Sequence, residues 1–237
     1  MKVRYSYLPQ QFGDCDDLWA DLKRFVPTGD FTLGEPLKEF EESFAKLIGT
    51  RFAIGVNSGT DAIKLSLKTL GISPGDEVIT AANTFVATVG AICELGAIPV
   101  FVDCDDTFCM NTQLIDSKIS DKTKAILPVH FTGYMTDMRE INRIATSNNL
   151  IVVEDACQSI LGSIDGINAG KWGHPAAFSL HPLKNINVWS DGGVIVTNKK
   201  NYYKKLCLLR NHGLSNRDTV KILGFNSRLD TFQEIAA

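Results

Sequence analysis

Val153-Glu154-Asp155-Ala156-Cys157-Gln158 ends one apolar run of this chain, and Phe178-Ser179-Leu180-His181-Pro182-Leu183-Lys184-Asn185 ends the next. The turn Ser190-Asp191-Gly192-Gly193 follows closely. Continuous apolar runs that end in polar residues are typical of strands in a sheet that is buried on both faces. Ligands of such sheets bind at the carboxyl ends of the strands. We therefore expect Asp155 and Lys184 to lie at one ligand-binding edge.

Asp155 and Lys184 suit a cofactor that needs a charge at one end and an imine at the other. Pyridoxal phosphate is such a cofactor, because its carbonyl takes a lysine as Schiff base and its ring nitrogen pairs with an aspartate. Each residue alone has a commoner explanation, since most lysines are exposed and a strand-end aspartate is usually a cap or a hydrogen-bonded group. Ser179 and the double glycine 192–193, which lets backbone pass closely, favour the cofactor.

Three further segments at expected strand ends carry candidate site residues. Asn57-Ser58-Gly59-Thr60 precedes a helix, so its N–H groups and hydroxyls can face a phosphate; an ordinary helix cap is the alternative. Phe85 can stack on a flat ring or pack in the core, which is the default for phenylalanine. His130 is either a substrate contact or a structural hydrogen-bonding residue.

Helices and strands alternate along the chain. The expected strands are 51–56, 77–81, 98–103, 124–129, 150–154, 176–180 and 193–197. The expected helices are 16–25, 36–48, 85–95, 137–147 and 201–210, with another from the 57–60 turn to residue 70. This order predicts an α/β fold of three layers, with helices on both faces of a mostly parallel sheet.

Length, composition and charge exclude several classes of protein. The 237 residues are 44% hydrophobic and 22% charged, as in ordinary globular proteins. A net charge of -3 argues against a nucleic-acid partner, which needs a concentrated basic face. No apolar run reaches transmembrane length, and the six cysteines form no C-x-x-C pair, so we expect neither a membrane span nor a metal site. These features predict a cytoplasmic protein.

Eight motifs in order give the chain a family resemblance from about Gly29 onward. They are Asn57–Ala62, Pro74–Ile79, Asn83–Phe85, Glu154–Gln158, the spacing of Ser179 and Lys184, Asp191–Gly193, Arg210–Gly213 and Gly224–Leu229. Together they closely resemble the DegT/DnrJ/EryC1/StrS family, the sugar aminotransferases of the fold-type I pyridoxal phosphate enzymes. Each motif alone is weak, whereas eight in the same order are hard to produce by chance.

The resemblance implies an aspartate-aminotransferase-like large domain and a role for each site residue. Lys184 would bind the cofactor covalently and shuttle the proton, and Asp155 would pair with the ring nitrogen. The remaining contacts would be Gln158 beside the phenolic oxygen, Phe85 stacked on the ring, Ser58, Gly59, Thr60 and Ser179 around the phosphate, and Asn226 at the phosphate of a neighbouring subunit.

The resemblance also implies the reaction and the partners. Family members are usually homodimers with shared active sites, and they move an amino group, generally from glutamate, to a nucleotide-linked keto-sugar for surface polysaccharides or other amino sugars. We expect an N-terminal arm and first helix over 1–28, a cofactor-binding large domain over 29–237, and no C-terminal small domain. The alternatives are a truncated, non-catalytic or regulatory protein and a sugar dehydratase; Lys184 disfavours the dehydratase, since such relatives typically have histidine there.

Overall fold

Eight strands form one continuous sheet in the computed structural model, which describes residues 3–237. Two four-stranded pieces, β3-β2-β4-β5 and β1-β10-β9-β6, meet where Val129 bridges Asp155. The strands are β1 (Phe52–Val56), β2 (Glu77–Ala81), β3 (Ile98–Val102), β4 (Thr123–Leu127), β5 (Ile151–Val152), β6 (Glu154–Asp155), β9 (Pro175–Ser179) and β10 (Gly193–Thr197).

Only β10 among these strands runs against the others. It is antiparallel to β1 and to β9, whereas the pairs β2–β3, β2–β4, β4–β5 and β6–β9 are parallel. The prediction of a mostly parallel sheet is therefore confirmed. The first residue of β10, Gly193, lies between the carboxyl ends of β1 and β9, where candidate site residues are expected.

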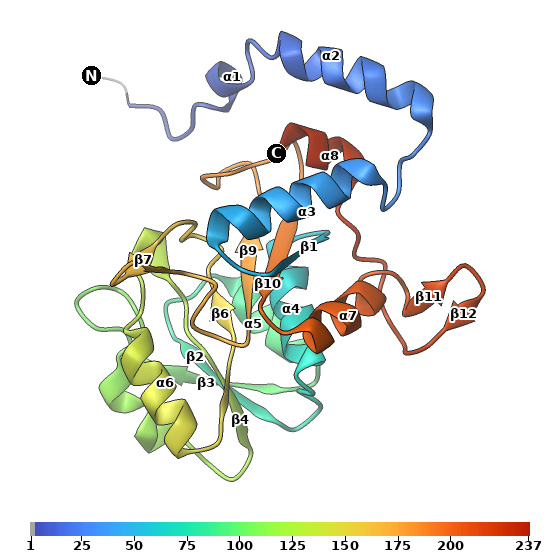
Figure 1. Ribbon diagram of the computed structural model, residues 1–237. Helices are drawn as coiled ribbons and strands as arrows, with labels where there is room; N and C mark the ends of the chain where they lie inside the picture. The colour runs from blue at the N-terminus through green and yellow to red at the C-terminus, as the bar shows by residue number, and fades with distance from the viewer. Residues whose placement is uncertain (1–2) are drawn as a thin grey trace.

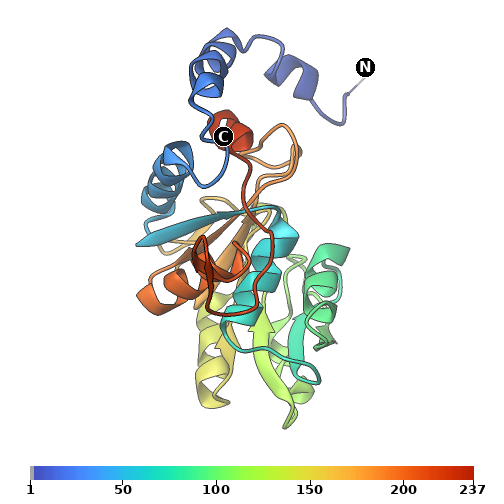
Figure 2. The ribbon, with the colours of Figure 1, turned by 90° about the vertical axis from the view of Figure 1, so that its right-hand side faces the viewer.

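Helices cover both faces of the sheet (Figures 1 and 2). α3 (Glu35–Ile48) and α6 (Met138–Ser147) pack on one face, in a core with Ile79 and Ile126. α4 (Gly59–Thr69), α5 (Val86–Cys93) and α7 (Lys200–Leu209) pack on the other, with Val78 and Leu127. Successive strand residues thus point into different cores, as the pleat of a strand requires. The predicted three layers are confirmed.

Helix ends follow the capping residues of the sequence. Ser58 caps α4, where its hydroxyl oxygen accepts the Asp61 N–H at 3.1 Å. Asp137 caps α6 by accepting the N–H groups of Arg139 and Glu140. Gly49 ends α3 in the left-handed conformation, with φ 84°, which glycine adopts without strain.

Two expected elements differ from the structure. The strand expected over 150–154 is split, since β5 pairs with β4 and β6 pairs with β9. At Val153 the pairing partner changes from β4 to β9, although the Val153 N–H still donates to the carbonyl of Ile126 in β4. The helix expected over 85–95 is α5, Val86–Cys93, because Phe85 has an extended backbone and acts as its N-cap.

Smaller elements surround the sheet. α1 (Leu8–Gln11), α2 (Asp16–Phe25) and the 3-10 turn η1 (Val26–Thr28) form an N-terminal segment above α8 (Thr231–Ala236) in both views (Figures 1 and 2). The hairpin β11 (Leu214–Asn216) and β12 (Thr219–Val220) projects from the body (Figure 1). The other pieces are the β7 (Ser163–Ile164) and β8 (Ile167–Asn168) hairpin and the 3-10 turns η2 (Thr112–Leu114), η3 (Asp116–Lys118) and η4 (Phe131–Gly133).

Two further findings concern the described part of the chain. No helix in residues 3–237 combines the length and apolar character that a bilayer crossing requires. Within the same residues, no three or more histidine, cysteine or carboxylate side chains gather as metal ligands.

Candidate active site

The candidate site lies where the carboxyl ends of β1, β6 and β9 meet the start of β10. Gly193, the first residue of β10, pairs with Val56 of β1 on one side and with Ser179 of β9 on the other. β9 in turn pairs with β6, where Asp155 is opposite Ala177. The turns that follow these strands therefore share one edge of the sheet.

Two glycines allow these turns to approach closely. A methyl group on Gly193 would lie 2.3 Å from the Ser58 carbonyl oxygen and 2.8 Å from the Gly59 nitrogen. A methyl group on Gly59 would lie 2.7 Å from Cβ of Ser179 and 3.1 Å from Sγ of Cys157. Real side chains do not tolerate such contacts without movement of their neighbours. Glycine at 59 and 193 is thus required for the turn after β1 to lie against β9 and β10.

The N-terminus of α4 has the features of an anion site. The backbone N–H groups of Gly59 and Thr60 have no hydrogen-bond partner among residues 3–237. Such groups, together with the helix dipole, favour a phosphate. Ser179 adds a hydroxyl from the opposite side, because its Oγ lies 3.1 Å from the position of a methyl group on Gly59.

Asp155 is buried at the end of β6, and both of its carboxylate oxygens are held. Oδ2 accepts the hydroxyl of Thr88 at 2.7 Å, and Oδ1 accepts the Cys157 N–H at 3.2 Å. Only 4% of the residue is exposed. Burial of a carboxylate without hydrogen-bond donors would cost free energy. These two hydrogen bonds offset that cost and allow Asp155 to be buried.

Lys184 lies in the loop between β9 and β10 and lines a small cavity. Cys157, Gln158 and Ser179 line the same cavity. The loop is fixed by its backbone, since the Lys184 N–H donates to His181 at 2.8 Å and its carbonyl accepts Nδ2 of Asn187 at 3.0 Å. The Lys184 amine has no hydrogen-bond or ion-pair partner within residues 3–237, which leaves it available for a ligand.

The charges of Asp155 and Lys184 affect the pKa of the Cys157 thiol in opposite directions. Burial raises the pKa of this thiol well above its usual value, and the negative charge of Asp155 raises it further. The positive charge of Lys184 opposes that rise in pKa. The backbone N–H of Cys157 also donates to Asp155, and Cys157 lines the cavity together with Lys184, so one residue adjoins both groups.

Gln158 lines the cavity beside Lys184, and Phe85 precedes α5, whose Thr88 contacts Asp155. Oε1 of Gln158 accepts the Thr132 N–H at 3.0 Å, which leaves the amide NH₂ group as a donor. Phe85 is 69% exposed. Core packing is thus wrong as an explanation of Phe85, and its ring is available for stacking.

Asn226 does not line the cavity that contains Lys184, and its side chain is exposed. Its backbone bridges to Asn211 at the base of the projecting hairpin. Its neighbour Ser227 turns inward instead and donates to Asp61 at 2.6 Å. Asn226 therefore faces outward beside the start of α4.

The N-terminal segment contacts the loop that carries Lys184. Gln11 of α1 donates to Oδ1 of Asn187 at 3.1 Å, and Asn187 holds the Lys184 carbonyl. Trp19 of α2 packs against Trp189 with ring centroids 5.1 Å apart. The described part of the expected arm, residues 3–28, is thus in contact with the loop that carries Lys184.

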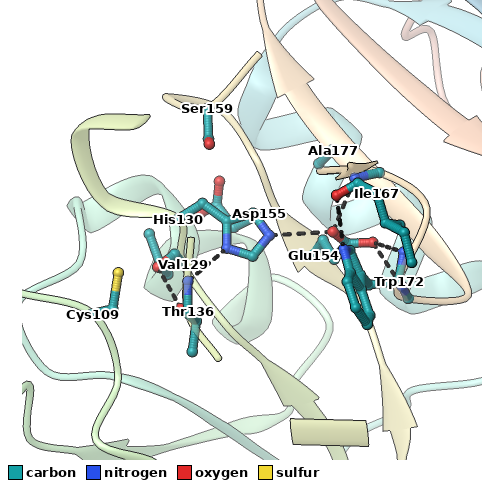
Figure 3. A network of polar contacts seen from close by, with 12 residues as sticks. Cys109, Val129, His130, Thr136, Glu154, Asp155, Ser159, Ile167, Trp172 and Ala177 are labelled. Carbon is teal, nitrogen blue, oxygen red and sulfur yellow. Dashed lines mark hydrogen bonds and ion pairs between the residues drawn. The ribbon is translucent and has the colours of Figure 1, made fainter. Parts of the chain in front are cut away.

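The sequence did not reveal the buried network behind Asp155 (Figure 3). Glu154 accepts the N–H groups of Gly170, Trp172 and Gly173 and contacts Nε2 of His130 at 3.2 Å. His130 is fully buried, and its Nδ1 accepts the Thr136 N–H, which favours the structural interpretation of this residue. The acidic pair Glu154-Asp155 and the strand-end residue His130 are the signals in the sequence that pointed to part of this network.

The chemistry of these groups fits pyridoxal phosphate. The free N–H groups and hydroxyls suit its phosphate, the buried carboxylate suits its ring nitrogen, and the unpartnered amine suits its carbonyl. Sheet order and site geometry are those of the large domain found in pyridoxal phosphate-dependent aminotransferases. The chain belongs to the DegT/DnrJ/EryC1/StrS aminotransferase family, whose sequence profile matches residues 15–237. The resemblance is confirmed.

Named relatives support this assignment. The chain is 42% identical to a pleiotropic regulatory protein of Geobacillus stearothermophilus, over 90% of this chain and 57% of the relative. It is 40% identical to a UDP-N-acetyl-3-dehydro-alpha-D-glucosamine 3-aminotransferase of Acidithiobacillus ferrooxidans, over 93% of this chain and 60% of the relative. The chain thus spans less than two thirds of the length of these proteins.

A solved structure gives the same fold and supports the cofactor. NtdA of Bacillus subtilis, determined with bound cofactor PMP, superposes with a TM-score of 0.94 at 37% identity. The match covers 99% of this chain and 55% of that one. The prediction of a pyridoxal phosphate cofactor is confirmed for proteins of this fold, since PMP is the aminated form of that cofactor.

Proposed function

We propose that this chain is the cofactor-binding part of a pyridoxal phosphate-dependent transaminase. It would move an amino group, from glutamate, to a nucleotide-linked keto-sugar used in cell-surface polysaccharides or other amino sugars. One observation carries the proposal: Asp155 and the unpartnered Lys184 amine lie at one sheet edge, beside the free N–H groups of α4. The aminotransferase of A. ferrooxidans, named for an oxidised sugar nucleotide, supports the substrate class.

The chain would bind the cofactor at three points. Gly59, Thr60 and the hydroxyls of Ser58 and Ser179 would hold the phosphate. Asp155 would hold the ring nitrogen, and Gln158 would donate its amide to the phenolic oxygen. The exposed ring of Phe85 would cover one face of the cofactor ring and exclude water from it.

Lys184 would perform the proton transfer. When bound, the cofactor supplies an electron sink for the charge left at the donor carbon, which Asp155 supports by keeping the ring nitrogen protonated. The free Nζ amine of Lys184 would act as the base that takes the proton from Cα of the amino donor and holds it for return.

The site would be completed by a second copy of the chain. The outward position of Asn226, next to Ser227 at the start of α4, supports a contact with the cofactor phosphate of a partner subunit. The same proposal includes a homodimer, a cytoplasmic location and a large domain over residues 29–237 preceded by an arm.

A second candidate function is binding without turnover. The relative in G. stearothermophilus named as a pleiotropic regulatory protein favours a regulatory protein that binds the cofactor or a sugar nucleotide. The presence of Lys184 favours the transaminase, and it disfavours a dehydratase.

Borohydride reduction tests the first proposal. Purified chain is mixed with pyridoxal phosphate, reduced and digested, and mass spectrometry should find the cofactor on Lys184. Addition of glutamate before reduction should prevent the labelling and release 2-oxoglutarate. Lys184→Ala should abolish both results, whereas Lys204→Ala, a change on the exposed face of α7, should leave them intact. Labelling that persists in the presence of glutamate would favour binding without turnover. Absence of labelling would contradict the transaminase.

A further inference from the structure

Two threonine hydroxyls form a chain that ends on Asp155. Oγ1 of Thr84 lies 2.7 Å from Oγ1 of Thr88, which lies 2.7 Å from Oδ2 of Asp155. Thr88 is 1% exposed and Asp155 4% exposed. Thr84 precedes Phe85, and Thr88 is in the first turn of α5. This series of hydrogen bonds therefore begins next to Phe85, the residue proposed to stack on the cofactor ring.

The direction of both hydrogen bonds follows from the donors available. A carboxylate only accepts hydrogen bonds, so Thr88 gives its single proton to Asp155. Thr88 can then only accept from Thr84, and Thr84 must donate to it. The order of donation is Thr84 to Thr88 to Asp155, and such chains strengthen the terminal bond through mutual polarisation.

We propose that Thr88 is a positioning residue that holds the Asp155 carboxylate in place for the cofactor ring nitrogen, with Thr84 acting through it. This inference rests on the proposed function. The Cys157 N–H fixes Oδ1 and Thr88 fixes Oδ2, so the carboxylate plane cannot rotate about its χ2 angle without breaking a bond. Each oxygen retains a lone pair for a further donor, such as a protonated ring nitrogen.

The position of Thr88 distinguishes this role from ordinary packing. A valine of the same shape would fill the space equally well and would leave Oδ2 without a partner. The carboxylate could then turn away from the ring nitrogen towards another donor. Only ligands that carry that nitrogen should be sensitive to this change.

Binding of two cofactor forms tests the inference in the full chain. The probes are pyridoxal 5'-phosphate and its 1-deaza analogue, which has carbon in place of the ring nitrogen. Thr88→Val should weaken binding of the natural cofactor about tenfold, the loss expected for a hydrogen bond to a charged group. Binding of the analogue should change less than about twofold, since it makes no bond to Asp155. Thr88→Ser, which keeps the hydroxyl, should behave as the unaltered chain.

A double-substitution cycle tests the order of the chain. Thr84→Val should weaken natural cofactor binding in the unaltered chain and have no further effect beside Thr88→Val, because Thr84 acts only through Thr88. Equal losses for both cofactor forms, or no loss in Thr88→Val, would overturn the inference and leave the proposed function standing. Failure of the unaltered chain to bind pyridoxal phosphate would overturn both.

Discussion

At the scale of one residue, position 193 has no room for a side chain. Its missing side chain leaves room for the Ser58 carbonyl, which would be 2.3 Å from an added methyl group. We expect Gly193→Ala to lower the free energy of unfolding by about 2 kcal/mol, through forced movement of the turn after β1. Urea denaturation measures this loss, and phosphate affinity should fall with it, because the same turn contains Gly59.

Gly90 provides the matched control for this substitution. It lies in α5, and no atom is within 4 Å of the position of an added methyl group. Alanine is favoured over glycine inside a helix, so Gly90→Ala should raise the free energy of unfolding by about 0.5–1 kcal/mol. A loss at Gly90 equal to that at Gly193 would show that close approach of the backbone is not the cause.

Single residues also show how far the sequence predicts the site. Asp155 and Lys184 follow apolar strands and belong to motifs, so their position at the sheet edge could be expected. Thr88 could not, because a threonine in the first turn of a helix has no distinguishing pattern, and its contact with Asp155 joins residues 67 positions apart. Only the fold shows that the turn after β2 reaches the end of β6.

At the scale of elements, α3, α8 and the residue that follows α7 contribute to one buried group of charges. Glu41 of α3 is paired with Arg210 and accepts the Gly55 N–H at 2.7 Å. Glu234 of α8 is 5% exposed, and neither of its carboxylate oxygens has a hydrogen-bond partner within residues 3–237. Burial, and next the charge of Glu41, raise the pKa of Glu234 to about 8.

The raised pKa of Glu234 predicts a stability that falls as pH rises. An unfolded glutamate titrates near 4.5, so from about pH 4.5 to pH 8 the folded chain holds a proton that the unfolded chain has lost. The free energy of unfolding should therefore decrease across this window and level off above it. Glu234→Gln should flatten the decrease and be most stabilising near pH 8.

Denaturant unfolding at pH 5, 6.5 and 8 would check this prediction. Glu41 contributes in the same direction, because burial raises its pKa, although Arg210 opposes the rise. Glu39→Gln is the matched control, since Glu39 is an exposed glutamate of α3. A Glu234→Gln chain that keeps the pH dependence of the unaltered chain would rule out Glu234 as its source.

Elements were predicted better than their directions. Most expected strands lie within two residues of the observed ones, because apolar runs bounded by turns are a strong local signal. The antiparallel course of β10 was not predicted, since Val194, Ile195 and Val196 would be equally suitable in a parallel strand. The hairpins β7–β8 and β11–β12 were also missed, because strands of two or three residues leave no periodic pattern.

At the scale of the whole molecule, the proposed dimer predicts complementation between defective chains. Suppose that each site takes Lys184 from one subunit and Asn226 from the other. Lys184→Ala and Asn226→Ala chains are each defective alone, but a mixed dimer contains one site with both residues. Co-expression should therefore restore release of 2-oxoglutarate from glutamate.

A second mixture controls for this effect. Lys184 and Asp155 belong to one site within a chain, so Lys184→Ala mixed with Asp155→Asn should leave both sites defective and restore nothing. Restoration in this control would point to exchange of chains or to residual activity. Absence of restoration in the first mixture would place Asn226 in the site of its own subunit.

The single antiparallel strand has a consequence for synthesis of the chain. β2, β3 and β4 can pair as soon as residue 127 has left the ribosome, whereas β1 has only β10 as a neighbour, and Phe52 waits for Thr197. Pairing between distant segments is slow and leaves apolar surface exposed in the meantime. The turn at 57–60 is among the first parts of the sheet to be translated, and it is among the last to gain its support. A ribosome that stalled before residue 193 would therefore hold a nascent chain with its central strands paired and with the turn at 57–60 not yet packed against β10.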